Sequence, residues 1–347
     1  MHRSGCFHDA GRATLGVAHR LEEPDRVLNT GLHSVRRFAV AAGVAVAGAL
    51  TAPAATVAAG PESKPALLYV ASVGGGNQPA AVDIYPLADV IAGNAPKPRQ
   101  EILGLSGPVA VAIDQAGDFY VADEGAKLVA VFHQGRTHPY KEYFLGITDP
   151  FDVAVGPDGT LYVANGATAS GGANVIEIRK GQRKPFLAIS GFPGYQNPCI
   201  HVDGANNLYV ASVVSQGSGS VGTVVKYPPG SSSGTTLNLP NLPLPTGITV
   251  DSAGSGDIVV SGTASLSFGA QVNVVAYYGY YGASYVGLGM RSSFGKIAFT
   301  PDASALVAAD GTTSVHSFSN VLAPVGAFAL GPNRYPVGVA VWPADLN

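Results

Sequence analysis

One short apolar pattern recurs six times along the chain and constrains its fold more than any other feature. It has Tyr or Val at a fixed position, as in LLYVAS, FYVAD and LYVAN. The copies occupy residues 67–72, 119–123, 161–165, 208–212, 258–262 and 306–310. Equivalent positions lie 42 to 51 residues apart, which is the usual length of a four-stranded propeller blade. The repeat therefore predicts an all-β fold, a six-bladed β-propeller.

A second pattern, an alternating strand that often begins with Pro, precedes every copy of the first pattern except the earliest. These strands occupy residues 108–114, 150–156, 198–203, 245–251 and 294–300. A sixth strand, residues 336–342, has no Tyr-Val strand after it, whereas residues 67–72 have no alternating strand before them. We therefore expect the C-terminal strand to pair with the first mature strand and to close the ring, which removes exposed sheet edges.

The composition agrees with many short strands joined by tight turns. The chain contains 45 Gly and 25 Pro, and these residues alternate with runs rich in Val, Ile and Tyr. Only 12% of the residues are charged, which suits sheets that are buried on both faces. Long helices are not expected.

Residues 36–59 have the three parts of a secretory signal peptide. Arg36 and Arg37 precede 13 apolar residues, and small side chains then run up to Gly60. The alternative is a membrane anchor, because the apolar stretch continues to about 20 residues, although Pro53 argues against it. Residues 1–35 form a polar extension that suggests a misplaced start site. We expect residues 60–347 to form the propeller.

The mature chain has few features that favour a nucleic-acid partner or a disulfide. From Gly60 onward it carries 14 Lys and Arg against 19 Asp and Glu, so its net charge is about −5. Cys199 is the only cysteine that remains after cleavage, which excludes an intrachain disulfide. We expect a monomer that is secreted, or located in the periplasm or cell envelope, without a stable membrane span.

The repeat unit resembles the NHL repeat over residues 64–347. Its elements are a Pro, alternating Val or Ile, Asp and Gly, and then Leu-Tyr-Val-Ala-Asp/Asn. It is more distantly similar to gluconolactonase-like lactonases and to streptogramin lyases. The lactonase resemblance implies a calcium-like ion held by Glu, Asn and Asp, but residues 65–68 and 246–248 do not carry that pattern. We therefore predict no metal and no cofactor.

Three residues differ in kind from the small side chains that dominate the strand expected to line the central channel. They are Asp152, His201 and Lys296. Sixfold geometry places Asp152 and Lys296 on opposite walls of the channel, with His201 next to Asp152. A buried charge requires a partner or water. These residues either form a polar site with acid, base or ligand-binding groups, or fix the packing of the blades through hydrogen bonds.

Further candidates lie where the channel should open. Asp149, Asn197, Arg334 and Tyr335 stand at the start of inner strands. Arg334 is the best anion-binding candidate, because its planar guanidinium suits carboxylates. The same face should carry long loops rich in Gly and Ser, at residues 72–80, 165–173 and 212–222, and such loops often form binding surfaces.

Fold alone does not decide function, because propellers include enzymes, receptors and scaffolds. We expect a binding or interaction module that takes a protein, a glycan or a small molecule on the channel-mouth face, with no catalytic residue assigned. The alternative is a lactonase- or lyase-like enzyme with its site in the channel.

Overall fold

The computed structural model describes residues 65–167, 172–191, 197–216, 219–251, 256–265, 271–279, 282–287, 295–311, 314–319 and 324–343. The chain divides into two units, residues 1–60 and 61–347, and every described residue belongs to the second. The expected signal peptide, residues 36–59, therefore lies outside the described residues. No helix within the described part is long and apolar enough to cross a membrane.

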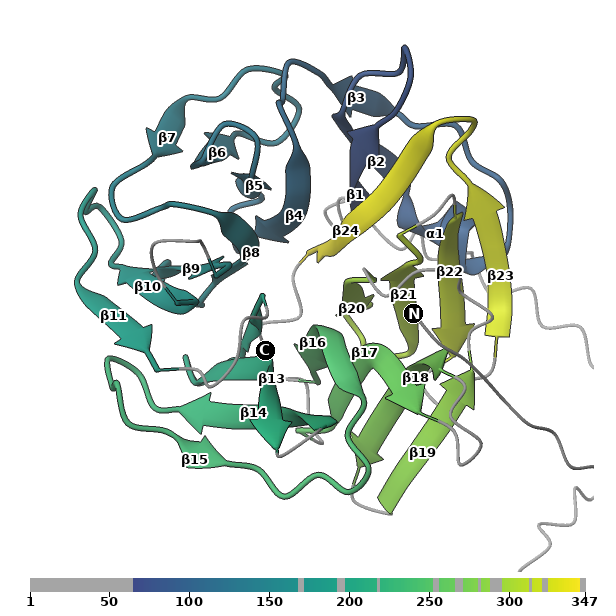
Figure 1. The fold of residues 1–347 in the computed structure, drawn as a ribbon. Coiled ribbons are helices and arrows are strands. Elements are labelled where there is room, and N and C mark those ends of the chain that lie inside the picture. Colours follow the sequence, from purple (N-terminus) through teal and green to yellow (C-terminus); the bar gives the residue numbers. More distant parts are fainter. Residues whose placement is uncertain are drawn as a thin grey trace, which may run out of the picture. The chain divides into compact units, whose positions relative to one another are not determined.

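The second unit is an all-β ring of six four-stranded antiparallel sheets, which confirms the predicted six-bladed propeller (Figure 1). Blade 1 contains strands β24, β1, β2 and β3 from the centre outward, and blades 2 to 6 each take four consecutive strands, from β4 to β23. The innermost strands are β4 (Pro108–Ile113), β8 (Pro150–Val155), β12 (Cys199–Val202), β16 (Leu244–Val250), β20 (Ile297–Phe299) and β24 (Arg334–Trp342).

The six recurrent Tyr-Val segments form the second strands, as the repeat predicted. These are β1 (Leu67–Gly74), β5 (Phe119–Asp123), β9 (Leu161–Asn165), β13 (Leu208–Gln216), β17 (Ile258–Ser265) and β21 (Ala305–Ala309). The third strands are β2 (Ala81–Pro86), β6 (Leu128–Phe132), β10 (Asn174–Ile178), β14 (Gly219–Tyr227), β18 (Gln271–Gly279) and β22 (Ser314–Ser319). The outer strands are β3 (Gln100–Ile102), β7 (Lys141–Tyr143), β11 (Leu187–Ser190), β15 (Thr235–Thr236), β19 (Gly282–Gly287) and β23 (Pro324–Ala329).

The two ends of the described propeller share one blade. Strand β24 pairs antiparallel with β1, from Leu67 opposite Trp342 to Gly74 opposite Arg334, with one register shift at Ala71 and Ser72. The closure predicted from the two incomplete repeats is therefore present. Because β24 is the innermost strand of blade 1, it also packs against the neighbouring blades on both sides.

The core lies between neighbouring blades rather than inside any one of them. Each buried cluster joins the facing surfaces of two sheets, and Tyr69 with Phe119 is an example, since their ring centroids are 5.1 Å apart across blades 1 and 2. Fully buried Val, Ala, Leu and Tyr side chains of the second strands supply much of this core. The alternating pattern in the sequence thus reflects sheets that are covered on both sides.

Two local features differ from the sequence-based expectation. Residues 212–222, expected to be a loop, mostly extend the β13–β14 hairpin, in which Ser212 pairs with Thr223 and Gln216 with Gly219. A short helix, α1 (Leu87–Ile91), follows β2 and buries Leu87 and Val90. Gly and Ser content alone did not separate a long hairpin from a loop, because backbone pairing can continue through small residues.

Candidate functional site

The six innermost strands surround a central cavity of about 120 Å³. Its wall is mostly Ala, Val and Ile, and the polar or charged side chains that line it are Asp152, His201, Thr249 and Lys296. The apolar majority follows from the convergence of the blades, which leaves space only for small side chains near the axis. The exceptions predicted from the sequence all lie on this cavity.

Lys296 reaches across the channel and pairs with Asp152. Its Nζ atom lies 2.9 Å from Oδ2 of Asp152, although the two residues belong to blades 6 and 3. Both side chains are at least nine-tenths buried. The two residues were predicted to lie on opposite walls of the channel, and their backbones do. The long lysine side chain nevertheless brings the two charged groups together.

Other groups complete the surroundings of this ion pair. Oδ2 of Asp152 also accepts a hydrogen bond from the backbone N–H of Ile200 at 2.9 Å, which ties blade 3 to blade 4. The Lys296 ammonium lies 3.5 Å from Sγ of Cys199 and 4.4 Å from the ring centroid of Phe151. The ion pair and its neighbours therefore join blades 3, 4 and 6.

The electrostatic balance keeps the lysine charged and the thiol neutral. Burial lowers the pKa of Lys296, but attraction from Asp152 and Cys199 more than offsets that effect, so the pKa is raised. Burial raises the pKa of Cys199 to about 11, although Lys296 opposes the shift. The Asp152 and Lys296 charges are thus directed at each other, as expected of a buried pair that fixes the packing.

His201 lines the same cavity without joining this cluster. Its Nε2 atom is buried and has no hydrogen-bond partner among the described residues. Burial lowers the pKa of His201 to about 4, against smaller raising effects from Asp203 and Val250. At neutral pH the imidazole is therefore uncharged.

The lowered pKa of His201 should make stability depend on pH. The folded pKa lies below the ordinary value of 6.5, so the unfolded chain takes up the proton first and stability falls as pH drops from about 6.5 to about 4. A shift of this size corresponds to about 3 kcal/mol. Denaturant unfolding between pH 7 and 4 measures it, and His201→Ala, the residue that blade 3 carries at this position, should flatten the loss. An equal pH slope in both proteins would contradict the assignment.

At the channel mouth, Asp149 and Asn197 come together over a glycine. A Cβ on Gly166 would stand 2.5 Å from Oδ2 of Asp149 and 2.4 Å from Oδ1 of Asn197, so only glycine leaves room for the two oxygens. The backbone N–H of Gly166 donates to the Asp149 carbonyl at 2.7 Å. Both side chains remain partly exposed. The pKa of Glu124 is raised, mainly by burial and to a smaller extent by the nearby charge of Asp149.

Arg334 lies at the start of β24 and is engaged within blade 1. Its Nη1 atom lies 2.7 and 2.6 Å from the two carboxylate oxygens of Asp83 and 3.1 Å from Oε1 of Glu101. The carboxylates that it binds are thus those of its own blade. Tyr335, the next residue, packs its ring against Gly75 in the loop after β1.

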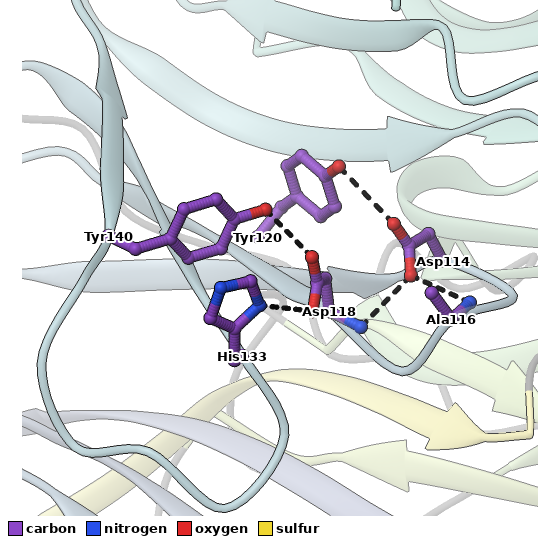
Figure 2. Close-up of polar contacts among 6 residues, drawn as sticks. All are labelled: Asp114, Ala116, Asp118, Tyr120, His133 and Tyr140. Atoms are coloured by element: carbon purple, nitrogen blue, oxygen red, sulfur yellow. Dashed lines mark hydrogen bonds and ion pairs between the residues drawn. The ribbon is translucent and has the colours of Figure 1, made fainter.

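At the opposite end of the channel, a carboxylate turn closes the inner and second strands of blade 2 (Figure 2). Asp114 accepts hydrogen bonds from the backbone N–H groups of Ala116 and Asp118, at 2.9 Å each, and from the Tyr120 hydroxyl at 3.4 Å. Asp118 in turn contacts Nδ1 of His133 at 2.9 Å and accepts from Tyr140 at 2.7 Å. The hydrogen bonds that Asp114 accepts from the backbone are typical of a turn, as the repeated Asp and Gly predicted.

The structure therefore joins the predicted site residues in two separate pairs, Asp152 with Lys296 and Asp149 with Asn197. His201, Arg334 and Tyr335 do not contact either pair through any described interaction. The sequence did not predict that Asp83 and Glu101 are the partners of Arg334. An Asp within the otherwise apolar strand AVDIY was the one available signal, because a buried carboxylate needs a cation nearby.

Comparisons with known proteins concern the fold of the chain and not its function. No protein-family model and no curated protein match the chain. Among solved structures, a protein from Lactobacillus plantarum is 14% identical with a TM-score of 0.52, over 80% of this chain and 99% of that one. Kuenenia stuttgartiensis hydrazine synthase is 16% identical with a TM-score of 0.49, over 74% of this chain and 81% of that one. At such identities the similarity concerns the fold alone.

Proposed function

We propose that the chain is an exported six-bladed propeller of the NHL-repeat type that binds its ligand on the channel-mouth face. The carrying observation is the convergence of the Asp149 and Asn197 oxygens over Gly166, where both side chains remain open to solvent. The charges inside the channel, in contrast, are directed at each other. The signal-like residues 36–59 support export, and N-terminal sequencing of the mature protein should then begin between Ala55 and Gly60.

The chemistry of the mouth favours a ligand with several hydrogen-bond donors. A carboxylate and an amide oxygen are the groups that converge there, and Glu124 adds a second acid nearby. Hydroxyl groups of a glycan suit this set better than an anion does. A protein or another small molecule that presents hydroxyl or amine donors would use the same groups.

Asp149→Ala and Asn197→Ala should each weaken ligand binding at least tenfold, because each removes an acceptor that the ligand uses. Thermal stability should change little, since both side chains are partly exposed. The measurement is binding to an oligosaccharide array, followed by titration calorimetry on the sugar that binds. Glu142→Gln, on the outer strand of blade 2, is the control. Unchanged affinity in both mouth variants would contradict the proposal.

His201 favours the second candidate, a lactonase- or lyase-like activity in the channel. A neutral imidazole with an unpartnered Nε2 atom on a cavity is suited to accept a proton. Turnover of a lactone or uronate substrate that His201→Ala abolishes at unchanged melting temperature would favour this enzyme over the binding module.

A further inference from the structure

A hydrogen bond between a tyrosine and an aspartate occurs at equivalent positions of two blades. In blades 2 and 4 the tyrosine of the second strand donates to the aspartate that follows the inner strand. Tyr120 does so to Asp114 at 3.4 Å, and Tyr209 to Asp203 at 3.1 Å. Figure 2 shows the blade 2 example. In these two blades the tyrosine hydroxyl therefore has a partner within its own blade.

Blade 3 lacks that partner. Gly156 occupies the position of the aspartate, and a Cβ there would stand only 2.4 Å from Oδ1 of Asn206, which reaches over from blade 4. Tyr162, the equivalent tyrosine, is only 3% exposed, yet its hydroxyl makes no hydrogen bond with any described residue. The hydroxyl oxygen itself is not fully buried, so a ligand can reach it from solvent.

A carboxylate lies beside this hydroxyl. Glu177 is directly opposite Tyr162 in the β9–β10 pairing, where blade 2 has Val131 and blade 4 has Lys226. Glu177 is 5% exposed, and its nearest described cation is Nε of Arg179, 3.8 Å away. No hydrogen bond to the Glu177 carboxylate is made within the described part of the chain.

Both groups line a pocket between blades 3 and 4, at the face opposite the mouth. The pocket is open to solvent and has a volume of about 420 Å³. Its walls are formed by Asp158, Thr160, Tyr162, Glu177, Arg179, Lys180, Pro229 and Gly230. The side chain of Arg179 is half exposed and that of Glu177 is buried, so acceptors lie deep and a cation lies near the opening.

We propose that this pocket binds a small zwitterion with the chemistry of a free α-amino acid. Its ammonium group would donate to Glu177 and to the Tyr162 oxygen, neither of which makes a hydrogen bond to a described residue. Its carboxylate would face Arg179 and Lys180. Acids and bases in equal number favour a ligand that itself carries both charges.

Titration calorimetry with the twenty free α-amino acids tests the site in the intact protein. At least one should bind, and Glu177→Gln and Tyr162→Phe should each weaken it tenfold or more without lowering the melting temperature. Glycine betaine, which has no N–H donor, should not compete. If no amino acid binds, or if Glu177→Gln binds as tightly as wild type, the proposal is wrong. Binding of a neutral sugar that Glu177→Gln weakens and Asp149→Ala leaves unchanged would also overturn it.

Tyr209→Phe is the matched control, because it removes the same hydroxyl from blade 4, where that group donates to Asp203. It should lower the melting temperature and leave amino-acid binding intact. Glu177→Val, which copies blade 2, should abolish binding and raise the melting temperature. The mouth variant Asp149→Ala should have no effect on this pocket, so the two sites can fail independently.

Discussion

Deleting residues 332–347 is expected to unfold the propeller. The deletion removes β24, the innermost strand of blade 1, and with it the pairing along the whole of β1. Val339, Val341 and Trp342 are buried against the neighbouring blades. Each contributes about 1.5–3 kcal/mol through burial, against a total stability of about 5–15 kcal/mol. Circular dichroism and thermal melting should show no cooperative transition in the truncated protein.

A circular permutant separates loss of the strand from loss of the chain end. Trp342 lies opposite Leu67 in the β24–β1 pairing, so a short linker from residue 343 to residue 65 would make a simple hairpin. New termini between β23 and β24 should then leave a folded, cooperatively melting protein. A truncated protein as stable as the full chain would show that β24 does not hold the ring closed.

Breaking the Asp152–Lys296 pair should destabilise the propeller more than any other single substitution in the channel. Lys296→Met leaves a buried carboxylate without its cation, and Asp152→Asn leaves a buried ammonium near only Cys199 and Phe151. Removing one partner of a buried pair typically costs about 3–5 kcal/mol. Denaturant unfolding measures both variants, and the exposed Lys184→Met is the control.

The double variant distinguishes a coupled pair from two independent residues. Asp152→Asn keeps an oxygen that accepts from the Ile200 N–H, and Met fills the channel in place of the lysine stem. The double variant should therefore recover most of the loss, because neither charge is then left buried alone. Additive losses would mean that the two residues stabilise the channel separately.

The fold could be predicted because the same structural unit occurs six times in the sequence. Period-two alternation marked the strands, and the incomplete units at residues 67–72 and 336–342 identified which strands had to pair. The expected loop at residues 212–222 was wrong because strand pairing continues there between small side chains. Local residue type does not record whether a neighbouring backbone is in register.

The site was only partly accessible from the sequence. Asp152, Lys296 and His201 were visible because they interrupt a run of small residues, but nothing in their spacing showed that Lys296 spans the channel to Asp152. The convergence of Asp149 and Asn197 also depends on the distance between two blades. Contacts of this kind depend on the diameter of the ring, which the sequence of a single repeat does not determine.

The blade 3 pocket was missed although its signal was present. Gly156 replaces a recurring aspartate, and Glu177 stands where another blade has Val131. An added polar group stands out along an apolar strand, whereas a lost one leaves a glycine that looks like any other turn residue.

The most direct test compares two variants for binding to the oligosaccharide identified on the array. The central claim is that the channel charges hold the blades together while the mouth binds the ligand. Titration calorimetry should find that Asp149→Ala loses affinity at least tenfold, and that the Asp152→Asn, Lys296→Met double variant binds like wild type. If the double variant loses binding while Asp149→Ala retains it, the channel is the binding site and the central claim is wrong.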